Sequence, residues 1–217
     1  MIDMQSPKLS QRERAKKQRR DRIVEAATSL LREIPHESVS VKMIAERSGL
    51  SATTVFNLFG TKSAIFSKVF DRDAELFESK VMQFACEDAL DRAFIAIDVA
   101  IGLYRDDEPF YRATVWEHGL ELGEGVHAHR HEPRMRFWKN ILSAAEQEGS
   151  ITLNGQAEPA AEMIIFLWRG AMADWIAGGR DLDGLRTSVR FEIASLLAAW
   201  ALPEAQARVR RWVNLPG

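Results

Sequence analysis

The sequence VKMIAERSGLSATTVFNLF, residues 41–59, carries the strongest structural signal in the chain. A short helix is predicted on each side of Gly49, because glycine readily adopts the left-handed backbone that ends a helix. Ser40 and Ser51 each precede one of these helices, where a hydroxyl can accept hydrogen bonds from unpaired backbone N–H groups. The pattern is typical of a helix-turn-helix unit, with an ordinary helical hairpin as the alternative.

Basic residues are concentrated around this unit. Residues 8–70 hold 13 lysines and arginines against six acidic residues, a net charge of +7, whereas residues 71–217 carry −8. The total of −2 over 217 residues would by itself argue against a nucleic-acid partner. Divided along the chain, the charge instead indicates a basic part that meets DNA and an acidic part that does not.

Helical periodicity runs along the whole sequence and predicts an all-α protein. Ser10 and Glu13 form a capping-box pattern at the start of a first helix, which Pro35 ends. Segments of turn-forming composition separate the later helices. Their expected ranges are 41–48, 52–59, about 62–86, 91–105, 109–119, 133–148, 158–177 and 182–201.

Between Lys16 and Asp71 the sequence resembles the TetR family of bacterial transcriptional regulators. The order is a basic first helix, a two-helix reader and a Thr-Lys-Ser start to a long fourth helix. The stretches that carry the resemblance are 23–27 (IVEAA), 40–45 (SVKMIA), 48–51 (SGLS), 53–59 (TTVFNLF) and 61–63 (TKS). Phe56 departs from the family's usual tyrosine, whose hydroxyl typically reaches a phosphate, and Ile34-Pro35-His36 replace a frequent glycine.

The resemblance implies a three-helix helix-turn-helix DNA-binding domain followed by a larger helical domain for ligand binding and dimerisation. Residues 1–15 are expected to form a basic arm, residues 16–75 the DNA-binding domain with its reader pair at 40–59, and residues 76–217 the effector-binding and dimerisation domain. The basic run 12–22 is either a solvated helix face or an arm on the DNA backbone or minor groove, and its unbalanced charge favours the arm.

DNA contacts follow from the resemblance position by position. The expected phosphate contacts are Ser51, Thr54 and Lys62, the expected base readers are Ala52, Thr53 and Asn57, and Ser40, Lys42 and Phe56 complete the predicted interface. Asn57 can pair with an adenine edge, whereas Phe56 can touch a thymine methyl but cannot donate a hydrogen bond. Lys42 and Arg47 are either peripheral phosphate contacts or solvated charges.

The last two expected helices, 158–177 and 182–201, are unusually apolar and mix small with large side chains. The second has two apolar stripes, one of Phe191, Ala194, Ala198 and Ala201 and the other of Ile193, Leu196 and Trp200. They suggest one side packed within the subunit and one against a partner, with a single core helix as the alternative. The resemblance implies a four-helix bundle between two copies. We therefore predict a homodimer, which suits a palindromic double-stranded operator.

Aromatic residues are frequent in the middle helices, where most helical proteins use them as core. The resemblance implies a cavity for a small-molecule effector there, and such pockets are mostly apolar. Tyr104, Trp116, His118 and Trp138 are the expected lining residues. The predicted function is a ligand-responsive transcriptional repressor, and activation in place of repression stays open.

Other functional classes fit the sequence less well. No nucleophile elbow, phosphate-binding glycine loop, metal motif or dinucleotide fingerprint is present, so we expect neither an enzyme nor a cofactor. A scaffold that binds only protein would leave the basic excess without a role. His127, His129 and His131 lie in a glycine-flanked segment, 119–131, expected to be a loop, where they bind a metal, are solvated or titrate near pH 6.5.

The expected compartment is the cytoplasm. Cys86 is the only cysteine, so no intrachain disulfide can form and no cysteine-based zinc site can be built from one chain. No apolar run follows the basic N-terminus as a signal peptide requires. The most apolar region, 160–178, is interrupted by charged residues, so no transmembrane helix is expected.

Overall fold

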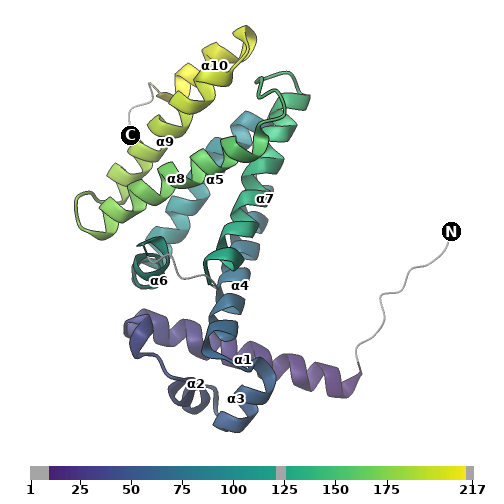
Figure 1. Ribbon diagram of the computed structural model, residues 1–217, viewed down its shortest axis with the longest axis vertical. Coiled ribbons are helices and arrows are strands. Elements are labelled where there is room, and N and C mark those ends of the chain that lie inside the picture. Colours follow the sequence, from purple (N-terminus) through teal and green to yellow (C-terminus); the bar gives the residue numbers. More distant parts are fainter. Residues whose placement is uncertain (1–9, 121–125, 214–217) are drawn as a thin grey trace, which may run out of the picture. The chain divides into compact units, whose positions relative to one another are not determined.

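The computed structural model describes the backbone of residues 10–120 and 126–213, and the side chains of residues 10–114 and 132–212. Apart from one isolated β-bridge, regular structure in these residues is helical (Figure 1). The helices are α1 (Gln11–Glu33), the 3-10 turn η1 (His36–Ser38), α2 (Val41–Ser48), α3 (Ala52–Phe59), α4 (Lys62–Met82), α5 (Ala89–Asp106), α6 (Glu108–Leu120), α7 (Val126–Gln147), α8 (Ala157–Ile176), α9 (Leu182–Trp200) and α10 (Pro203–Val213).

The chain divides into two compact units, Met1–Val69 and Phe70–Gly217, and the division lies inside α4. The boundary expected after residue 75 falls on the same helix. Within the described ranges, no helix combines the length and the apolar character needed to cross a bilayer. The all-α prediction is confirmed.

Local sequence signals set the ends of the first three helices. Ser10 and Glu13 form the expected capping box, with Ser10 N donating to Glu13 Oε2 at 2.8 Å and Glu13 N donating to Ser10 Oγ at 3.2 Å. Ser40 Oγ accepts from Met43 N at the start of α2. Gly49 ends α2 with a φ of 64°, the left-handed conformation that glycine adopts without steric cost.

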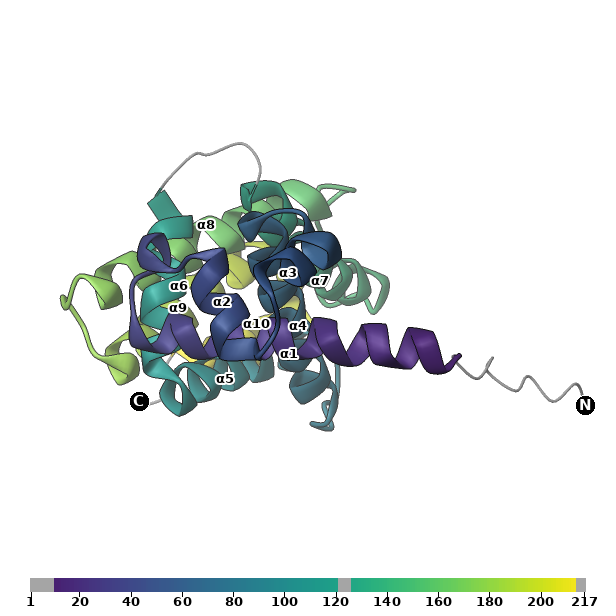
Figure 2. The same cartoon turned by 90° about the horizontal axis from the view of Figure 1, so that it is seen from below.

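The N-terminal unit is held together by a small apolar core. Ile23, Ala27 and Leu31 form the buried face of α1, and they are joined by Ile44 of α2 and Val55 of α3. α1 packs on α2, and α2 on α3. Figure 2 shows the three helices together, with the first turns of α1 extending past the other two. Those turns contribute nothing to this core, because residues 11–19 are all exposed.

In the C-terminal unit α8 packs against both α7 and α9, while α5 contacts the same two helices and α10 covers part of α9 (Figure 1). Large side chains such as Phe94, Ile164 and Trp175 are almost completely buried between these helices. The loop before α8 is tied to the turn after α9 by two backbone hydrogen bonds, from Thr152 N to Trp200 O at 2.9 Å and from Leu202 N to Ser150 O at 3.0 Å. The pairing is too short to make a sheet.

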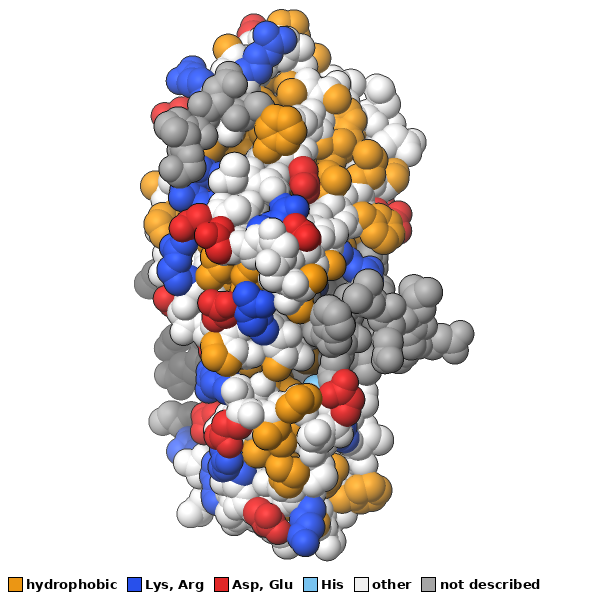
Figure 3. Space-filling view, turned by 90° about the vertical axis from the view of Figure 1, so that its left-hand side faces the viewer, with side chains coloured by type: hydrophobic (Ala, Val, Ile, Leu, Met, Phe, Trp, Pro, Cys, Tyr) orange, Lys and Arg blue, Asp and Glu red, His pale blue; other side chains and the backbone are white. Residues whose placement is uncertain are grey.

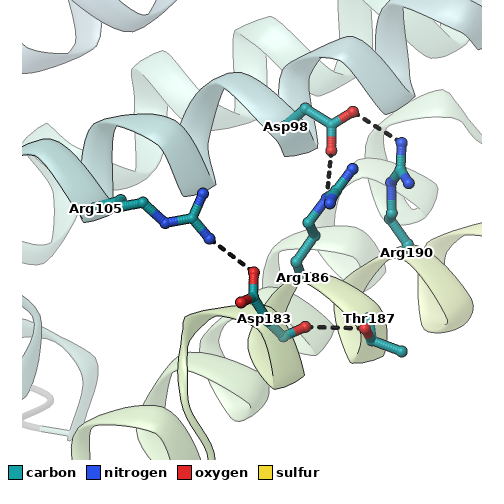
Figure 4. Close-up of polar contacts among 6 residues, drawn as sticks. All are labelled: Asp98, Arg105, Asp183, Arg186, Thr187 and Arg190. Atoms are coloured by element: carbon teal, nitrogen blue, oxygen red, sulfur yellow. Dashed lines mark hydrogen bonds and ion pairs between the residues drawn. The ribbon is translucent and has the colours of Figure 1, made fainter. Parts of the chain in front are cut away.

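An ionic cluster fastens α5 to α9 (Figure 4). Asp98 accepts from Arg186 Nε at 3.0 Å through one oxygen and from Arg190 Nη2 at 2.8 Å through the other. Burial lowers the pKa of Arg190, and its guanidinium lies 4.9 Å from the centre of the Trp212 ring. A second pair, Arg105 with Asp183 at 2.7 Å, joins the same helices further along.

Two helix limits differ by more than two residues from those expected from the sequence. α4 ends at Met82 and not near Cys86, because Phe84 is largely exposed and supplies little buried surface for a further turn. α7 begins at Val126 and passes through Pro133, so the second half of the expected loop 119–131 is helical. The last glycine of that segment is Gly125, but the prediction extended the loop to His131 and began the helix at Pro133, which placed the start too late.

The last helix, α10, was not predicted. Pro203 occupies its first position, where a proline loses nothing because that N–H has no partner within the helix. Ala205 and Val209 then follow at a spacing of four and are buried. The proline and this spacing are the sequence signals that would have identified it.

Candidate functional site

The exposed face of α3 is made of small, polar and aromatic groups. Ala52, Thr53, Phe56 and Asn57 all lie exposed on it, whereas Val55 on the opposite side is fully buried. No residue of α3 is charged. The face therefore offers methyl groups, a hydroxyl, an amide and an aromatic ring, with no carboxylate to repel an anionic ligand.

Hydroxyl groups surround the start of α3. Ser51 Oγ accepts from Thr54 N at 3.1 Å, which caps the helix, and it lies 2.8 Å from Thr54 Oγ1. Ser40, the cap of α2, is exposed as well. The N-terminus of a helix attracts anions through its partial positive charge and its free N–H groups. Ser51 and Thr54, the expected phosphate contacts, thus lie beside such a terminus.

Two arginines of α1 hold the helix pair in place. Arg20 Nη1 donates to Leu58 O at 2.6 Å, and its guanidinium lies 4.3 Å from the centre of the Phe59 ring. Arg22 Nη2 donates to the carbonyl oxygens of Ser48 and Gly49 in the turn between α2 and α3. Both contacts place a positive charge at the C-terminal end of a helix, where it is stabilising. These arginines fix the orientation of α3.

Two further cations of the basic unit also make internal contacts. Arg47 forms a bidentate pair with Glu33, with both distances at 2.7 Å, and its hydrogen bonds lower the pKa of that carboxyl. Lys62 Nζ donates to His36 O at 3.1 Å and to Val39 O at 2.9 Å. For Arg47, neither interpretation made from the sequence included this pair.

The exposed basic residues lie mainly on the first turns of α1. Arg12, Arg14, Lys16, Lys17 and Arg19 all belong to the exposed segment 11–19. Lys42, on the first turn of α2, has a side chain that is 84% exposed and stands 4.0 Å from Glu46. Exposed cations in the same unit as an uncharged, exposed helix face fit the surface of a duplex, whose phosphates are contacted by cations and whose bases are read from the groove.

A comparison with protein families gives a match over this unit. The model described as "Bacterial regulatory proteins, tetR family" matches residues 23–69, which include α2, α3 and the start of α4. Residues 23–69 therefore form a TetR-family DNA-binding domain, and the resemblance inferred from the sequence is confirmed.

Solved structures described as TetR regulators share the fold of most of the chain. Full-length TylP from Streptomyces fradiae is 21% identical with a TM-score of 0.67, covering 91% of this chain and 85% of that chain. A regulator from Rhodococcus sp. RHA1 is 19% identical with a TM-score of 0.65, covering 83% and 96%. One from Streptomyces coelicolor is 20% identical with a TM-score of 0.66, covering 91% and 89%. A comparison with curated proteins found no match.

The C-terminal unit contains a cavity of about 100 Å³. Aromatic side chains from five helices line it, among them Phe77 of α4, Tyr104 of α5, Tyr111 of α6, Trp138 of α7 and Trp168 of α8. Charged residues of both signs complete the lining: Asp73, Glu78, Arg134 and Arg169. A mostly apolar wall with a few polar groups is the usual composition of a small-molecule site.

Hydrogen bonds fix the polar groups of this lining. Tyr111 Oη donates to Asp73 Oδ1 at 2.5 Å, and burial together with the Asp73 charge raises the pKa of Tyr111, so the hydroxyl stays a donor. Tyr104 Oη accepts from Trp168 Nε1 at 3.1 Å and lies 3.5 Å from Met172 Sδ. The tyrosine and tryptophan rings are thereby held in place around the cavity.

Of the four residues expected to line an effector site, Tyr104 and Trp138 lie in this cavity. The side chains of Trp116 and His118 are outside the described residues, as are those of His127, His129 and His131. Among the side chains that are described, no cluster could hold a metal ion. Sequence reasoning missed Tyr111 and Trp168 as lining residues. Residue type and spacing alone do not separate the wall of a cavity from the core.

α8 and α9 leave large apolar side chains in solvent. Met163 and Phe166 of α8 and Phe191 of α9 are each about half exposed. Figure 3 looks onto the side of the C-terminal unit that carries α9 and shows hydrophobic side chains gathered there among charged ones. Ala194, which the sequence pattern placed on the same stripe as Phe191, is instead fully buried. The exposed stripe of α9 continues from Phe191 through Ser195, one turn later.

Proposed function

We propose that this protein is a ligand-responsive transcriptional repressor that binds a palindromic operator as a homodimer in the bacterial cytoplasm. The observation that carries the DNA-binding part is the uncharged, exposed face of α3 in the same unit as the exposed cations of α1. In this proposal α3 enters the major groove, where Ala52, Thr53 and Asn57 meet base edges. Ser40, Lys42, Ser51, Thr54, Phe56 and Lys62 complete the interface.

Phosphate contacts supply most of the affinity in this proposal. The hydroxyls of Ser51 and Thr54 lie at the N-terminus of α3 and can donate to phosphate oxygens. Lys62 keeps a third N–H beyond the two that its carbonyl acceptors use, because an ammonium group has three donors. The exposed cations of segment 11–19 extend the contact along the backbone or into the minor groove.

Dimerisation through α8 and α9 would cover the exposed Met163, Phe166 and Phe191. A two-fold dimer presents two copies of α3, so its operator is expected to be palindromic with half-sites about one helical turn apart or a multiple of it. A single reader helix of eight residues makes few base contacts, and pairing doubles them.

The effector is proposed to occupy the aromatic cavity. α4 begins with Lys62 in the N-terminal unit and carries Phe70, Asp73 and Phe77 on the cavity wall. A ligand that contacts this helix can therefore act on the position of the helix-turn-helix unit. It needs to prefer the conformation that does not bind DNA by only a few kcal/mol to release the operator.

In vitro selection of DNA from a random library tests the proposal most directly. The expected result is enrichment of a palindrome, which can then be sought upstream of this gene and its neighbours. Failure to enrich any sequence would overturn the DNA-binding proposal. Repression is supported if the selected palindrome lies within a promoter and its occupation lowers transcription in vitro. Raised transcription would instead indicate an activator.

The role of the α1 cations can be measured by salt dependence. The triple variant Arg12→Gln, Arg14→Gln, Lys16→Gln should flatten the log–log plot of affinity against salt by about 0.9 for each phosphate that the arm no longer neutralises. Arg210→Gln with Arg211→Gln, on exposed positions of α10, is a control of similar charge change outside the N-terminal unit. Equal slopes for the triple variant and the wild type would show that these cations of α1 do not contact DNA phosphates.

Ligand binding can be followed through the cavity tryptophans. Trp138 and Trp168 line the cavity, so a bound effector should change their fluorescence and, at the same concentrations, release the operator. Trp138→Ala should weaken both effects together. Release of DNA with no change in tryptophan fluorescence would place the effector elsewhere.

A further inference from the structure

Phe56 is the one large apolar side chain in the described part of the N-terminal unit that lies mostly in solvent, with 63% of its surface exposed. Its neighbours on α3 are used by the fold: Val55 is buried, and Phe59 is covered by the guanidinium of Arg20. The Phe56 ring makes no such contribution. Exposure of this apolar ring to water is unfavourable, and among the described residues the ring makes no contact that stabilises the fold.

The surroundings of Phe56 restrict what it can meet. Thr53 lies one turn before it and Asn57 directly after it, both exposed on the same face. α3 carries no arginine or lysine, so it lacks the side chains that most often read guanine in the major groove. What this face offers to a base pair is mainly apolar, and the apolar group that a major groove displays is the 5-methyl group of thymine.

We propose that Phe56 reads the 5-methyl group of a thymine in each operator half-site and is the main source of discrimination at that base pair. The inference rests on the proposed DNA-binding function and names the base that this residue selects. Ala52 lies four residues earlier, about 6 Å away along the helix axis, so its methyl group and the Phe56 ring occupy different positions on the face of α3.

Replacement of thymine by deoxyuridine tests this contact, because it removes the methyl group and leaves the base pair unchanged. With the selected operator in hand, each thymine of the half-site is replaced in turn, in both half-sites at once. For the wild-type protein, one position should weaken binding about fourfold for each half-site, the effect of one buried methyl group. Phe56→Ala should bind more weakly and should be insensitive to deoxyuridine at that same position.

Two further variants keep the test decisive. Phe56→Tyr retains the ring and should retain the sensitivity to deoxyuridine, whereas Asn57→Ala removes a neighbouring contact and should leave that sensitivity unchanged. Because Phe56 is exposed, Phe56→Ala should unfold at the wild-type temperature. Measurements at low salt, where phosphate contacts strengthen binding, keep the weaker variants within range.

The outcomes separate this inference from the proposed function. If no DNA sequence is enriched in the selection, the DNA-binding proposal itself fails. If an operator is found but no thymine shows a deoxyuridine effect in the wild type, or if Phe56→Ala keeps the full effect, the assignment of Phe56 is wrong while the DNA-binding function stands. Loss of the effect in Phe56→Ala alone supports the assignment.

Discussion

Arg22 lies so close over Gly49 that a β-carbon at position 49 would stand 2.9 Å from Arg22 Nη2. The same guanidinium donates to the carbonyl oxygens of Ser48 and Gly49. Position 49 thus favours glycine for two reasons: its φ is 64°, and a β-carbon would lie too close to the Arg22 guanidinium. The turn of the helix pair is shaped by a residue of α1 that lies far from it in the sequence.

Gly49→Ala should therefore destabilise the N-terminal unit. The left-handed backbone alone costs a residue with a β-carbon about 1–2 kcal/mol, and displacement of Arg22 adds to this. Thermal or urea unfolding measures the change. In an Arg22→Ala background the cost of Gly49→Ala should fall by at least about 0.5 kcal/mol, the coupling expected of residues in contact. Strict additivity of the two substitutions would contradict the close approach.

Replacement by methionine should lower the stability of the protein at Lys62 but not at Lys42. Lys62→Met leaves the carbonyl oxygens of His36 and Val39 without their charged donor, which should lower the free energy of unfolding by about 2 kcal/mol. Lys42→Met changes a side chain that is 84% exposed, so its stability should stay within about 0.5 kcal/mol of the wild type.

DNA affinity completes that comparison. Lys42→Met should reduce the salt dependence of operator binding by about 0.9 for each half-site if Lys42 contacts a phosphate, and should not change it if the charge is merely solvated. Unfolding in urea and binding at several salt concentrations give both readouts. A Lys62→Met protein as stable as the wild type would show that the two carbonyl contacts contribute nothing to the fold.

The helix pair could be predicted closely because its signals are local. Ser40, Gly49 and Ser51 act within one turn of their own positions, and the observed α2 and α3 have the expected limits, residues 41–48 and 52–59. Where the signal was a proline or glycine at the edge of a weakly patterned segment, the prediction was poorer. The start of α7 and the whole of α10 are the examples.

The internal roles of the basic residues could not be predicted from the sequence. Arg20 and Arg22 bind backbone carbonyls 38 and 26 residues away, and a carbonyl acceptor leaves no trace in residue type. Charge counting therefore assigned these residues to DNA together with the exposed cations. The structure separates the two groups by their hydrogen-bond partners, which composition does not record.

The Asp98 cluster should contribute more to stability than the neighbouring Asp183 pair (Figure 4). Asp98 is 40% exposed and bridges two arginines, one of them mostly buried, whereas Asp183 is 77% exposed and has one arginine partner. Asp98→Asn should cost about 1–2 kcal/mol, because it leaves a buried guanidinium without its counter-charge. Asp183→Asn, a matched change in the same pair of helices, should cost less than about 1 kcal/mol. Equal destabilisation of the two variants in urea unfolding would contradict this ranking.

Phe166 offers the sharpest test of the proposed dimer. It lies on the outer face of α8 with 56% of its surface exposed, and a dimer through α8 and α9 would cover it. Phe166→Glu removes that ring and places two carboxylates of like charge in the interface, one from each copy. The variant should sediment as a monomer at micromolar concentration, since burying charge in an apolar interface is strongly unfavourable.

Phe84→Glu is the matched control for that variant. Phe84 is 54% exposed, follows α4 and lies outside α8 and α9, so its replacement should leave the sedimentation coefficient of a dimer unchanged. Both variants remove an equally exposed phenylalanine and add the same charge, so any difference reports on the location of the interface. Dissociation by both would point to a general effect of added charge, and a dimeric Phe166→Glu protein would place the contact on another surface. Loss of operator binding in step with dissociation would further connect the α8–α9 interface to the spacing of the two reader helices, because a monomer holds only one α3 against DNA.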